Sequence, residues 1–337
     1  MFKYSDSNKR YHTLDYYYKN KYNSKVFKVS LNLGFSCPNI DGTKGVGGCI
    51  YCKNGSGNNL DLSVSDQFEK IKNMIHKKWP VAKYIAYFQS NSNTYKDLAK
   101  LKRVSDEVLG YPNVVGINIA TRCDAIDDEC FLYLLELNKK TDLVIELGLQ
   151  TINDDTANII NRCHTLLEFE DMYKRLKENN IKVVVHIING LPYEDKEDML
   201  NTVRYLNRLK VDGIKIHMLH ILKGTKLLEL YNKDKFSILT REEYVDIVCD
   251  QLELLDEYIV INRITGDPEK NDLVEPNWLI KKFGVLNEID KEMKKRNSYQ
   301  GIKKGYWLSF LFYFFWYIFL FFFYEIWSEF TFRWHCF

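Results

Sequence analysis

Six short runs of strand-type residues recur along the first two thirds of the 337-residue chain, and helical patterns separate them. Each run is rich in Val, Ile, Leu or aromatic residues, and several are apolar almost throughout, as expected for strands covered on both faces. The runs mostly begin about thirty to forty residues apart, the size of one strand–helix unit. They span residues 26–33, 84–89, 114–120, 143–149, 181–188 and 214–219. Repeated units of this kind predict a parallel sheet.

Apolar residues recur at helix spacing between these runs, which predicts amphipathic helices on the faces of the sheet. The stripes are Phe68/Ile71/Ile75, Leu98/Leu101/Val104/Val108, Phe131/Leu134/Leu135, Phe169/Met172/Tyr173/Leu176 and Met199/Val203/Leu206. Six strand–helix units favour a partial (β/α)6 TIM-type barrel that is open on one side, with a doubly wound sheet as the alternative. A barrel would place its chemistry at the C-terminal ends of the strands.

Four segments are expected along the chain. Residues 1–25 form a basic, tyrosine-rich N-terminal segment, and residues 26–239 form the partial barrel. Residues 240–304 read as a charged helical extension, and residues 305–337 as an aromatic, apolar tail. The composition, 46% hydrophobic and 27% charged, is that of an ordinary globular protein.

Three cysteines lie in a glycine-rich loop directly after the first predicted strand: Cys37, Cys49 and Cys52. Three thiolates cannot complete a structural zinc site, which uses four protein ligands. They can hold three irons of a cubane 4Fe–4S cluster and leave the fourth iron open for a cofactor or substrate. A zinc site completed by a distant histidine is the alternative. The other cysteines are scattered and no signal peptide is evident, which favours a reducing cytoplasm over a disulfide framework.

Polar residues also follow the later strands, at the edge where a barrel would carry its site. They are Gln89-Ser90, Thr121-Arg122-Cys123-Asp124, Gln150-Thr151, Asn189-Gly190 and the pair His217/His220. Cys123 could serve as a fourth ligand, but an occupied fourth iron could bind no cofactor, so a buried thiol is preferred. The two histidines either contact the substrate or lie satisfied in the core.

The segment Cys37…Cys49-Ile50-Tyr51-Cys52 resembles the cysteine motif of radical S-adenosylmethionine (SAM) enzymes, with eleven residues in the first gap where the common motif has three. This long gap resembles that of the YhcC/YtqA-like (MnmL-like) family, whose core is related to the Elp3 radical domain. Cys123 departs from the family, which carries Pro there. Further similar blocks are Arg10-Tyr11, residues 25–31, 34–39, 87–95, 146–151, 162–165, 189–192, 215–220, 223–225, 263–267 and 299–301.

The resemblance implies a radical SAM partial barrel that uses a 4Fe–4S cluster to cleave SAM into a 5′-deoxyadenosyl radical, with an electron donor such as ferredoxin or flavodoxin. It implies that the cluster ligands are Cys37, Cys49 and Cys52. The residues expected to contact SAM are Tyr51, Gln89, Ser90, Glu146, Gln150, Arg162, Asn189 and Gly190.

Four of these residues have structural alternatives. Glu146 could be a buried strand carboxylate paired with a base, and Arg162 could form an ordinary salt bridge. Asn189 and Gly190 could form a plain strand-to-helix turn. No general base is assigned.

The resemblance implies modification of the wobble uridine of tRNA, of the kind attributed to MnmL-type relatives. Net charge is only +2, but residues 1–25 carry six Lys or Arg against two Asp, and residues 281–304 carry eight against three acids. Basic segments with aromatic residues can bind RNA, although a solvated surface has the same composition. The alternatives are a radical SAM enzyme with a small-molecule or peptide substrate, and a non-catalytic iron–sulfur or zinc regulatory protein.

The tail is unusual. Residues 306–324 carry no charge, and these nineteen residues are long enough for a membrane-spanning helix. Lys303 and Lys304 precede them, which would place the enzyme part in the cytoplasm. Fourteen of the nineteen are aromatic, whereas spanning helices are built mainly from aliphatic residues. The expectation is therefore a non-native tail, with a membrane tether and a core or partner-binding helix as alternatives.

Overall fold

The computed structural model describes residues 2–53 and 61–304. The aromatic tail and the expectations attached to it lie outside the described residues. Within the described ranges, every helix is too short or too polar to cross a bilayer.

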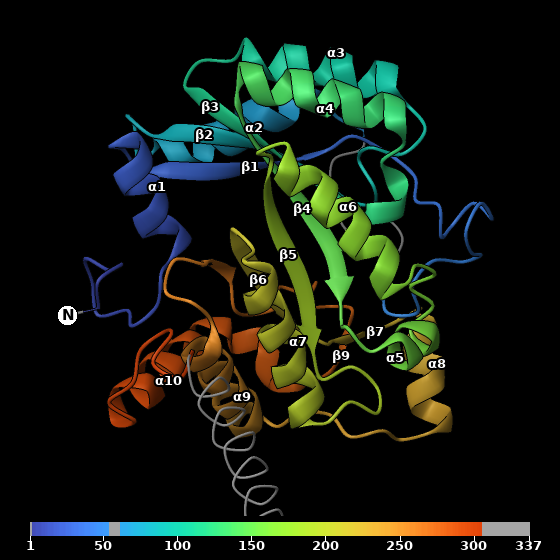
Figure 1. Ribbon diagram of the computed structural model, residues 1–337, viewed down its shortest axis with the longest axis vertical. Coiled ribbons are helices and arrows are strands. Elements are labelled where there is room, and N and C mark those ends of the chain that lie inside the picture. Colours follow the sequence, from blue (N-terminus) through green and yellow to red (C-terminus); the bar gives the residue numbers. More distant parts are fainter. Residues whose placement is uncertain (1, 54–60, 305–337) are drawn as a thin grey trace, which may run out of the picture.

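A parallel sheet of seven strands forms the centre of the molecule, in the order β1-β2-β3-β4-β5-β6-β8 (Figure 1). Each strand pairs in parallel with the next. The strands are β1 (Val26–Asn32), β2 (Lys83–Gln89), β3 (Val114–Thr121), β4 (Asp142–Gln150), β5 (Lys182–Asn189), β6 (Gly213–Met218) and β8 (Val260–Arg263). The sheet curls strongly, so that β1 runs across the view while β5 runs down it.

The six predicted strands are confirmed, with ends that differ by one residue. The strand order follows the chain without a reversal, which excludes a doubly wound sheet, because that fold changes direction at a switch point. The molecule is therefore a partial TIM-type barrel, and the prediction of its fold class is confirmed.

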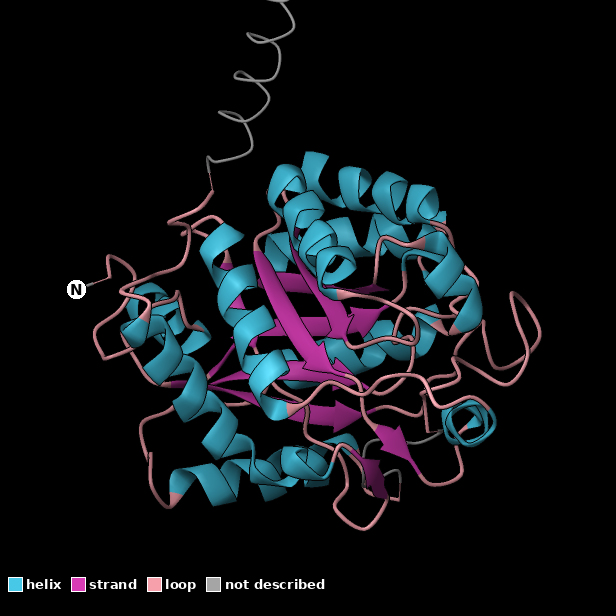
Figure 2. Ribbon diagram, turned by 90° about the horizontal axis from the view of Figure 1, so that it is seen from below, coloured by secondary structure: helices cyan, strands magenta, loops and turns pink. Residues whose placement is uncertain are grey.

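Helices cover the outer face of the curled sheet (Figure 2). The five predicted helices are α2 (Val64–His76), α3 (Leu98–Leu109), α4 (Asp128–Lys140), α6 (Leu166–Glu178) and α7 (Lys196–Leu209). Their starts carry side-chain caps that satisfy backbone N–H groups left free at a helix end. Thr165 and Asp195 form capping boxes at the starts of α6 and α7, and Asp127 accepts from the Cys130 N–H at α4.

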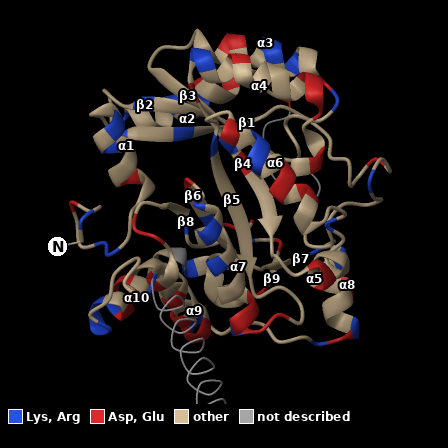
Figure 3. Ribbon diagram, in the orientation of Figure 1, with Lys and Arg blue, Asp and Glu red and all other residues tan. Residues whose placement is uncertain are grey.

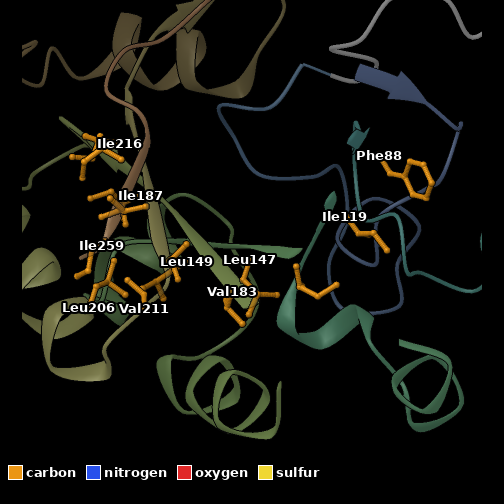
Figure 4. Packing of buried hydrophobic residues seen from close by; sticks show 14 of the residues in the cluster. Phe88, Ile119, Leu147, Leu149, Val183, Ile187, Leu206, Val211, Ile216 and Ile259 are labelled. Carbon is orange, nitrogen blue, oxygen red and sulfur yellow. The ribbon is translucent and has the colours of Figure 1, made fainter. Parts of the chain in front are cut away.

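The core lies between the sheet and these helices. Figure 4 shows part of this apolar layer: Leu147 and Val183 from neighbouring strands lie together, and Leu206 of α7 lies beside Val211. All four are fully buried. Burial of this apolar layer on the outer face leaves the inner face of the half-barrel free for polar residues.

The C-terminal segment contains more than the helices expected from sequence. It includes α9 (Arg241–Leu254) and α10 (Lys282–Lys295), but also β8, and β9 (Leu273–Glu275), which pairs antiparallel with β7 (Ile221–Leu222). The apolar run Ile259-Val260-Ile261 was the signal for β8, but a four-residue strand is too short to stand out against helical neighbours.

The N-terminal ends of the strands are closed by α1 (Leu14–Tyr22). Thr13 forms a bridge with Ile261 of β8, and Lys21 and Tyr22 both bond Asp142 at the start of β4. Tyr17 and Tyr18 of this helix line a cavity of about 160 Å³ at that end. The helix therefore closes the end of the barrel opposite the strand-end loops.

Candidate functional site

The cysteine loop (residues 37–52) joins the C-terminal end of β1 to the rest of the chain and protrudes on the right of Figure 1. Short-range backbone bonds shape it: Ile40 N–H donates to Cys37 O, and Cys52 N–H donates to Cys49 O, each at 2.9 Å. Gly47 and Gly48 adopt φ values of +80° and +78°, which side-chain-bearing residues rarely take. The glycines thus permit a fold of the loop that brings distant cysteines together.

Asn39, which sequence reasoning missed, is the hub of this loop. It is fully buried, and its Nδ2 donates to the Asn161 carbonyl and to Cys49 Sγ, the latter at 3.4 Å. Asn161 in turn donates to Gly48 O at 2.8 Å. Gly45 packs so closely that a β-carbon there would lie 2.2 Å from Asn39 Oδ1. The loop is therefore clamped against the end of the short helix α5 (Asp154–Ile159).

The three sulfur atoms share one environment. Burial raises the pKa of Cys52 to about 12, and the nearby Cys49 and Cys37 thiols contribute to the rise. Burial likewise raises the pKa of Cys49, while the Arg122 guanidinium opposes the shift. The Cys49 and Cys52 thiols are therefore protonated at neutral pH and would release their protons on binding metal as thiolates.

The chemistry of the donor set fits a cubane 4Fe–4S cluster. Among the described residues, no three His, Cys, Asp or Glu side chains converge as ligands of one metal ion would. A cubane attaches each thiolate to a different iron, so its sulfurs need not meet at a point. Three thiols on one clamped loop, close enough to influence one another electrostatically, match that requirement.

Two polar residues from neighbouring strand ends adjoin the sulfurs. Ser92, three residues after β2, donates its hydroxyl to Cys37 Sγ at 3.6 Å. Arg122 lies directly after β3, near Cys37 and Cys49. Burial lowers the pKa of its guanidinium, but the bonded Asp124 carboxylate raises that pKa, and Cys37 and Cys49 add to the rise. Arg122 donates to both Asp124 oxygens, at 2.8 and 2.7 Å. A fixed positive charge thus lies beside the cysteine loop.

The predicted residues Gln89, Ser90 and Gln150 lie at the same end of the sheet. Gln89 and Gln150 are the last residues of β2 and β4, and all three are half-buried. Ser90 and Gln150 have positive φ values of 46° and 71°, so the chain turns sharply where it leaves β2 and β4. A contact of these residues with SAM stays a prediction.

Tyr51 and Gly190 also remain near the loop end of the sheet. Tyr51 packs against a buried apolar cluster that includes Leu227 of α8, and burial together with Cys49 and Cys52 raises its pKa well above the usual range. Gly190 has a φ of +82° directly after β5, where a β-carbon would lie 3.2 Å from Leu239. Its N–H donates to Met199 Sδ at 3.2 Å.

Glu146 lies in the middle of β4 on the inner face, not at the C-terminal end of the strand, and is fully buried. Its Oε1 accepts from Lys28 and Asn118, both at 2.6 Å, and its Oε2 accepts from Lys215 at 2.5 Å and His186 at 2.9 Å. Burial raises its pKa, but Lys215 and Lys28 outweigh burial and hold the pKa well below the usual range. These contacts are those of the structural alternative, a buried carboxylate paired with bases.

The histidines of the inner face are neutral near pH 7. Burial lowers the pKa of His186 to about 4, with the Lys215 charge adding to the effect. Burial and His186 lower the pKa of His217 well below its usual range, and the His217 Nε2 atom has no described hydrogen-bond partner. His220 bonds the Met218 carbonyl at 3.1 Å. His220 thus has a structural contact, while His217 keeps one buried nitrogen free of described partners.

Arg162 and Asn189 are both fully buried and both are engaged by protein groups. Arg162 donates to the carbonyls of Leu149, Thr151 and His164 and to Asp154, which uses four of its five N–H groups. Asn189 exchanges two hydrogen bonds with Gln251 of α9, at 2.8 and 2.9 Å. These bonds pin the ends of β4 and β5, and the SAM contacts predicted for the two residues stay predictions.

Cys123, next to Arg122 in the chain, is buried. Burial raises the pKa of its thiol to about 12, and the Asp124 carboxylate adds to the rise. The preferred interpretation, a buried thiol, agrees with this position. Cys163 is nearer to the cysteine loop, since a β-carbon on Gly45 would lie 2.6 Å from its Sγ. It has a φ of +63° and donates to Asn161 Oδ1 at 3.2 Å.

The sequence matches known families over most of its length. Residues 42–206 match the Radical SAM superfamily, and residues 211–295 match the Radical SAM C-terminal domain. Protein YtqA of Bacillus subtilis is 45% identical over 305 residues, which cover 89% of this chain and 94% of that protein. Protein YhcC of Escherichia coli is 29% identical over 279 residues, covering 82% of this chain and 89% of that protein.

More distant similarity involves part of longer proteins. A tRNA uridine(34) acetyltransferase of Methanocaldococcus jannaschii is 25% identical over 184 residues, 54% of this chain and 33% of that protein. The solved structure of Methanocaldococcus infernus Elp3 aligns with a TM-score of 0.63 at 16% identity, covering 82% of this chain and 64% of that one. The fold, the three-cysteine loop and these matches agree: the chain belongs to the radical SAM superfamily, within the YhcC/YtqA-like group.

Proposed function

We propose that this radical SAM enzyme modifies the wobble uridine of tRNA, using a 4Fe–4S cluster and SAM. The observation that carries the radical chemistry is the placement of Cys37, Cys49 and Cys52 on one clamped loop at the C-terminal end of the half-barrel. When bound, the cluster and SAM supply an electron and a 5′-deoxyadenosyl radical that abstracts a hydrogen atom from the substrate.

The chain's own residues would hold and orient these groups. The three thiolates would hold three irons of the cluster. Asn39 and Ser92 donate hydrogen bonds to Cys49 and Cys37, which would lower the electron density on these sulfurs and help to tune the cluster. Arg122 stabilises negative charge beside Cys37 and Cys49. Its Nη1 atom has no hydrogen-bond partner among the described residues, so it can also donate to an anionic group.

The SAM-binding residues form two sets in this proposal. Gln89, Ser90, Gln150 and Gly190 lie at the same end of the sheet as the cysteine loop, where polar and backbone groups could approach the cofactor directly. Tyr51 offers a ring between two of the cysteines. Glu146, Arg162 and Asn189 would act by fixing strands or by residual hydrogen-bonding capacity, because their main bonds go to protein groups.

The choice of tRNA as substrate is supported by the relative named tRNA uridine(34) acetyltransferase, whose matched third corresponds to about half of this chain. An electron donor such as ferredoxin or flavodoxin would be required to reduce the cluster. The seven described cysteines are free, which supports a reducing compartment such as the cytoplasm.

Anaerobic reconstitution with iron and sulfide, followed by dithionite and SAM, tests the proposal in two stages. Release of 5′-deoxyadenosine that is lost in Cys37→Ala, Cys49→Ala and Cys52→Ala is expected. No release would favour a non-catalytic iron–sulfur or zinc protein.

Addition of unmodified tRNA should then give a mass change at the wobble nucleoside. If SAM is cleaved but no tRNA nucleoside changes, the substrate is a small molecule or a peptide.

A further inference from the structure

Helix α8 (Lys226–Lys233) packs directly on the cysteine loop. Leu227 N–H donates to Ile50 O at 2.9 Å, and the Lys226 ammonium lies so close to Gly47 that a β-carbon there would be 2.6 Å from Nζ. The apolar side of the helix joins Tyr51 in a buried cluster. Whatever binds to the outer side of α8 therefore lies beside the predicted cluster site.

The outer side of this helix and its flanks carry four exposed lysines, Lys223, Lys226, Lys233 and Lys235. None of them forms an ion pair with a carboxylate in the described part of the chain. Lys223 donates to the Asn271 carbonyl at 2.9 Å and Lys235 lies 3.9 Å from the Tyr231 ring centre, contacts that leave each positive charge uncompensated. The acids of the same stretch are Glu229 and Asp234, so the surface is net positive.

An exposed aromatic residue flanks the lysines. Tyr193, in the loop after β5, is 56% exposed although its backbone has a φ of +66°, a conformation that is unusual for a bulky residue. Its hydroxyl donates to Asp234 at 2.5 Å, and its ring lies 6.2 Å from that of Phe236. The strained turn and these two contacts hold an aromatic face toward solvent at the far end of α8.

The basic N-terminal segment is different. Its lysines Lys3, Lys9, Lys19, Lys21 and Lys25 all pair with carboxylates, and Arg10 bonds the Ser298 carbonyl at 3.1 Å. An ion-paired lysine gains less from a phosphate, because it must first give up its partner. Figure 3 shows how closely acidic and basic residues alternate near this segment and α10.

We infer that the α8 surface, defined as Lys223, Lys226, Lys233, Lys235 and Tyr193, is where the tRNA backbone docks beside the cluster. The lysines neutralise phosphates and the Tyr193 ring stacks on an unpaired base, the combination that single-stranded RNA loops offer. The α8 axis is about 12 Å long for its eight residues, enough to span adjacent nucleotides. This inference rests on the proposed tRNA substrate.

Matched double variants test the surface. Lys226→Ala/Lys233→Ala removes two exposed lysines of α8 that have no described carboxylate partner, and Lys3→Ala/Lys19→Ala removes two exposed lysines of the N-terminal segment that pair with Glu257 and Asp6. Each phosphate contact contributes roughly five- to eightfold in affinity at 0.1 M salt, from a salt slope of about 0.7–0.9 per contact. The α8 variant should bind bulk tRNA about 25- to 60-fold more weakly with a shallower salt dependence. The Lys3→Ala/Lys19→Ala variant should bind like the wild type, because both of its lysines are already neutralised by carboxylates.

Tyr193 separates stacking from charge. Tyr193→Ala should weaken tRNA binding roughly fivefold or more at every salt concentration, whereas Tyr193→Phe, which keeps the ring, should restore it. Iron and sulfide content after reconstitution and the circular dichroism of each variant show whether the fold is intact. A fall in affinity that Tyr193→Phe shares would contradict the stacking role.

The outcomes test the tRNA substrate and the α8 surface separately. Failure of the wild-type protein to bind tRNA at all would overturn the proposed substrate. Wild-type binding that the α8 variant retains in full would overturn the α8 surface and leave the substrate intact. If that variant also loses reduction by flavodoxin but not by dithionite, the surface instead receives an acidic electron-donor protein.

Discussion

The basic residues at the two ends of the curled sheet differ in whether carboxylates pair with them. At the N-terminal end of the strands, α1 closes the barrel and the neighbouring lysines are held by carboxylates, such as Lys21 by Asp142 and Lys25 by Asp15. At the C-terminal end, the cysteine loop lies open to polar residues from the neighbouring strands, and the lysines of the α8 surface have no described acidic partner. The lysines of the first end therefore stabilise the fold, whereas those of the α8 surface keep a charge that a ligand could neutralise.

This difference shows that a count of cations along a sequence does not identify a binding surface. The first 25 residues are the more basic segment by composition, yet all six of their cations have protein partners. Whether a lysine is available depends on which acid folds against it, and that acid can be far away, as Asp142 is from Lys21.

The largest expected effect concerns the loop end. Cys49→Ala should abolish iron–sulfur cluster assembly, because two thiolates cannot hold the cluster in the geometry that leaves one iron open. Iron and sulfide content and the visible absorption of the reconstituted protein measure this.

Cys249→Ala is the matched control, since Cys249 is a buried thiol in α9, away from the loop. It should keep normal cluster content. A cluster that survives Cys49→Ala, or disappears in Cys249→Ala, would place the ligands elsewhere.

The next effect lies in the middle of the barrel, between the two ends. Glu146→Ala removes the carboxylate that holds Lys28 and Lys215, which leaves one buried and one half-buried cation without it. We expect the free energy of unfolding to fall by about 3–5 kcal/mol, as is usual when one partner of a buried ion pair is removed. Denaturant unfolding measures it.

The comparison is Glu170→Ala on the surface of α6, where the carboxylate bonds Lys174 and Tyr205. That change should cost no more than about 1 kcal/mol. Equal effects for the two variants would mean that the inner network contributes no more than a surface pair.

A smaller effect is expected with pH. Folding lowers the pKa of His186 from its ordinary value of 6.5 to about 4, so between these values the unfolded chain binds the proton and the folded chain does not. Stability should therefore fall as the pH is lowered from 7 to 5. His186→Gln, which can still donate to Glu146, should lessen that fall by about 2 kcal/mol, at 1.36 kcal/mol per pH unit below 6.5. An unchanged pH profile would show that His186 titrates normally in the folded protein.

The smallest effect is expected at the closed end. Lys19 is exposed and pairs with Asp6. Lys19→Ala should leave tRNA affinity within about twofold of the wild type, because this lysine is already neutralised and its loss removes no free charge. A loss as large as that from one lysine of α8 would abolish the contrast between the two ends.

The sequence was most informative where a pattern is local. The six short apolar runs predict strands β1 to β6, and the five helical stripes predict α2, α3, α4, α6 and α7. Regular alternation of strand and helix patterns along the chain is compatible with few other folds. Strand β8 was missed since only four residues form it. The cysteine loop was recognisable because its spacing lies within one segment of chain.

The contacts of the site could not be predicted in the same way. Asn39, Ser92 and Arg122 reach the sulfurs through folds of the chain that bring β1, β2 and β3 ends together. The four partners of Glu146 come from four different strands, β1, β3, β5 and β6. Such a network depends on register across the whole sheet, which no local pattern in the sequence specifies.

The most direct test of the central claim is electron paramagnetic resonance of the reduced, reconstituted protein with and without SAM. A cubane held by Cys37, Cys49 and Cys52 with one open iron predicts a 4Fe–4S signal that changes when SAM binds. A signal that ignores SAM, or a protein that binds only one zinc ion and no cluster, would contradict the account.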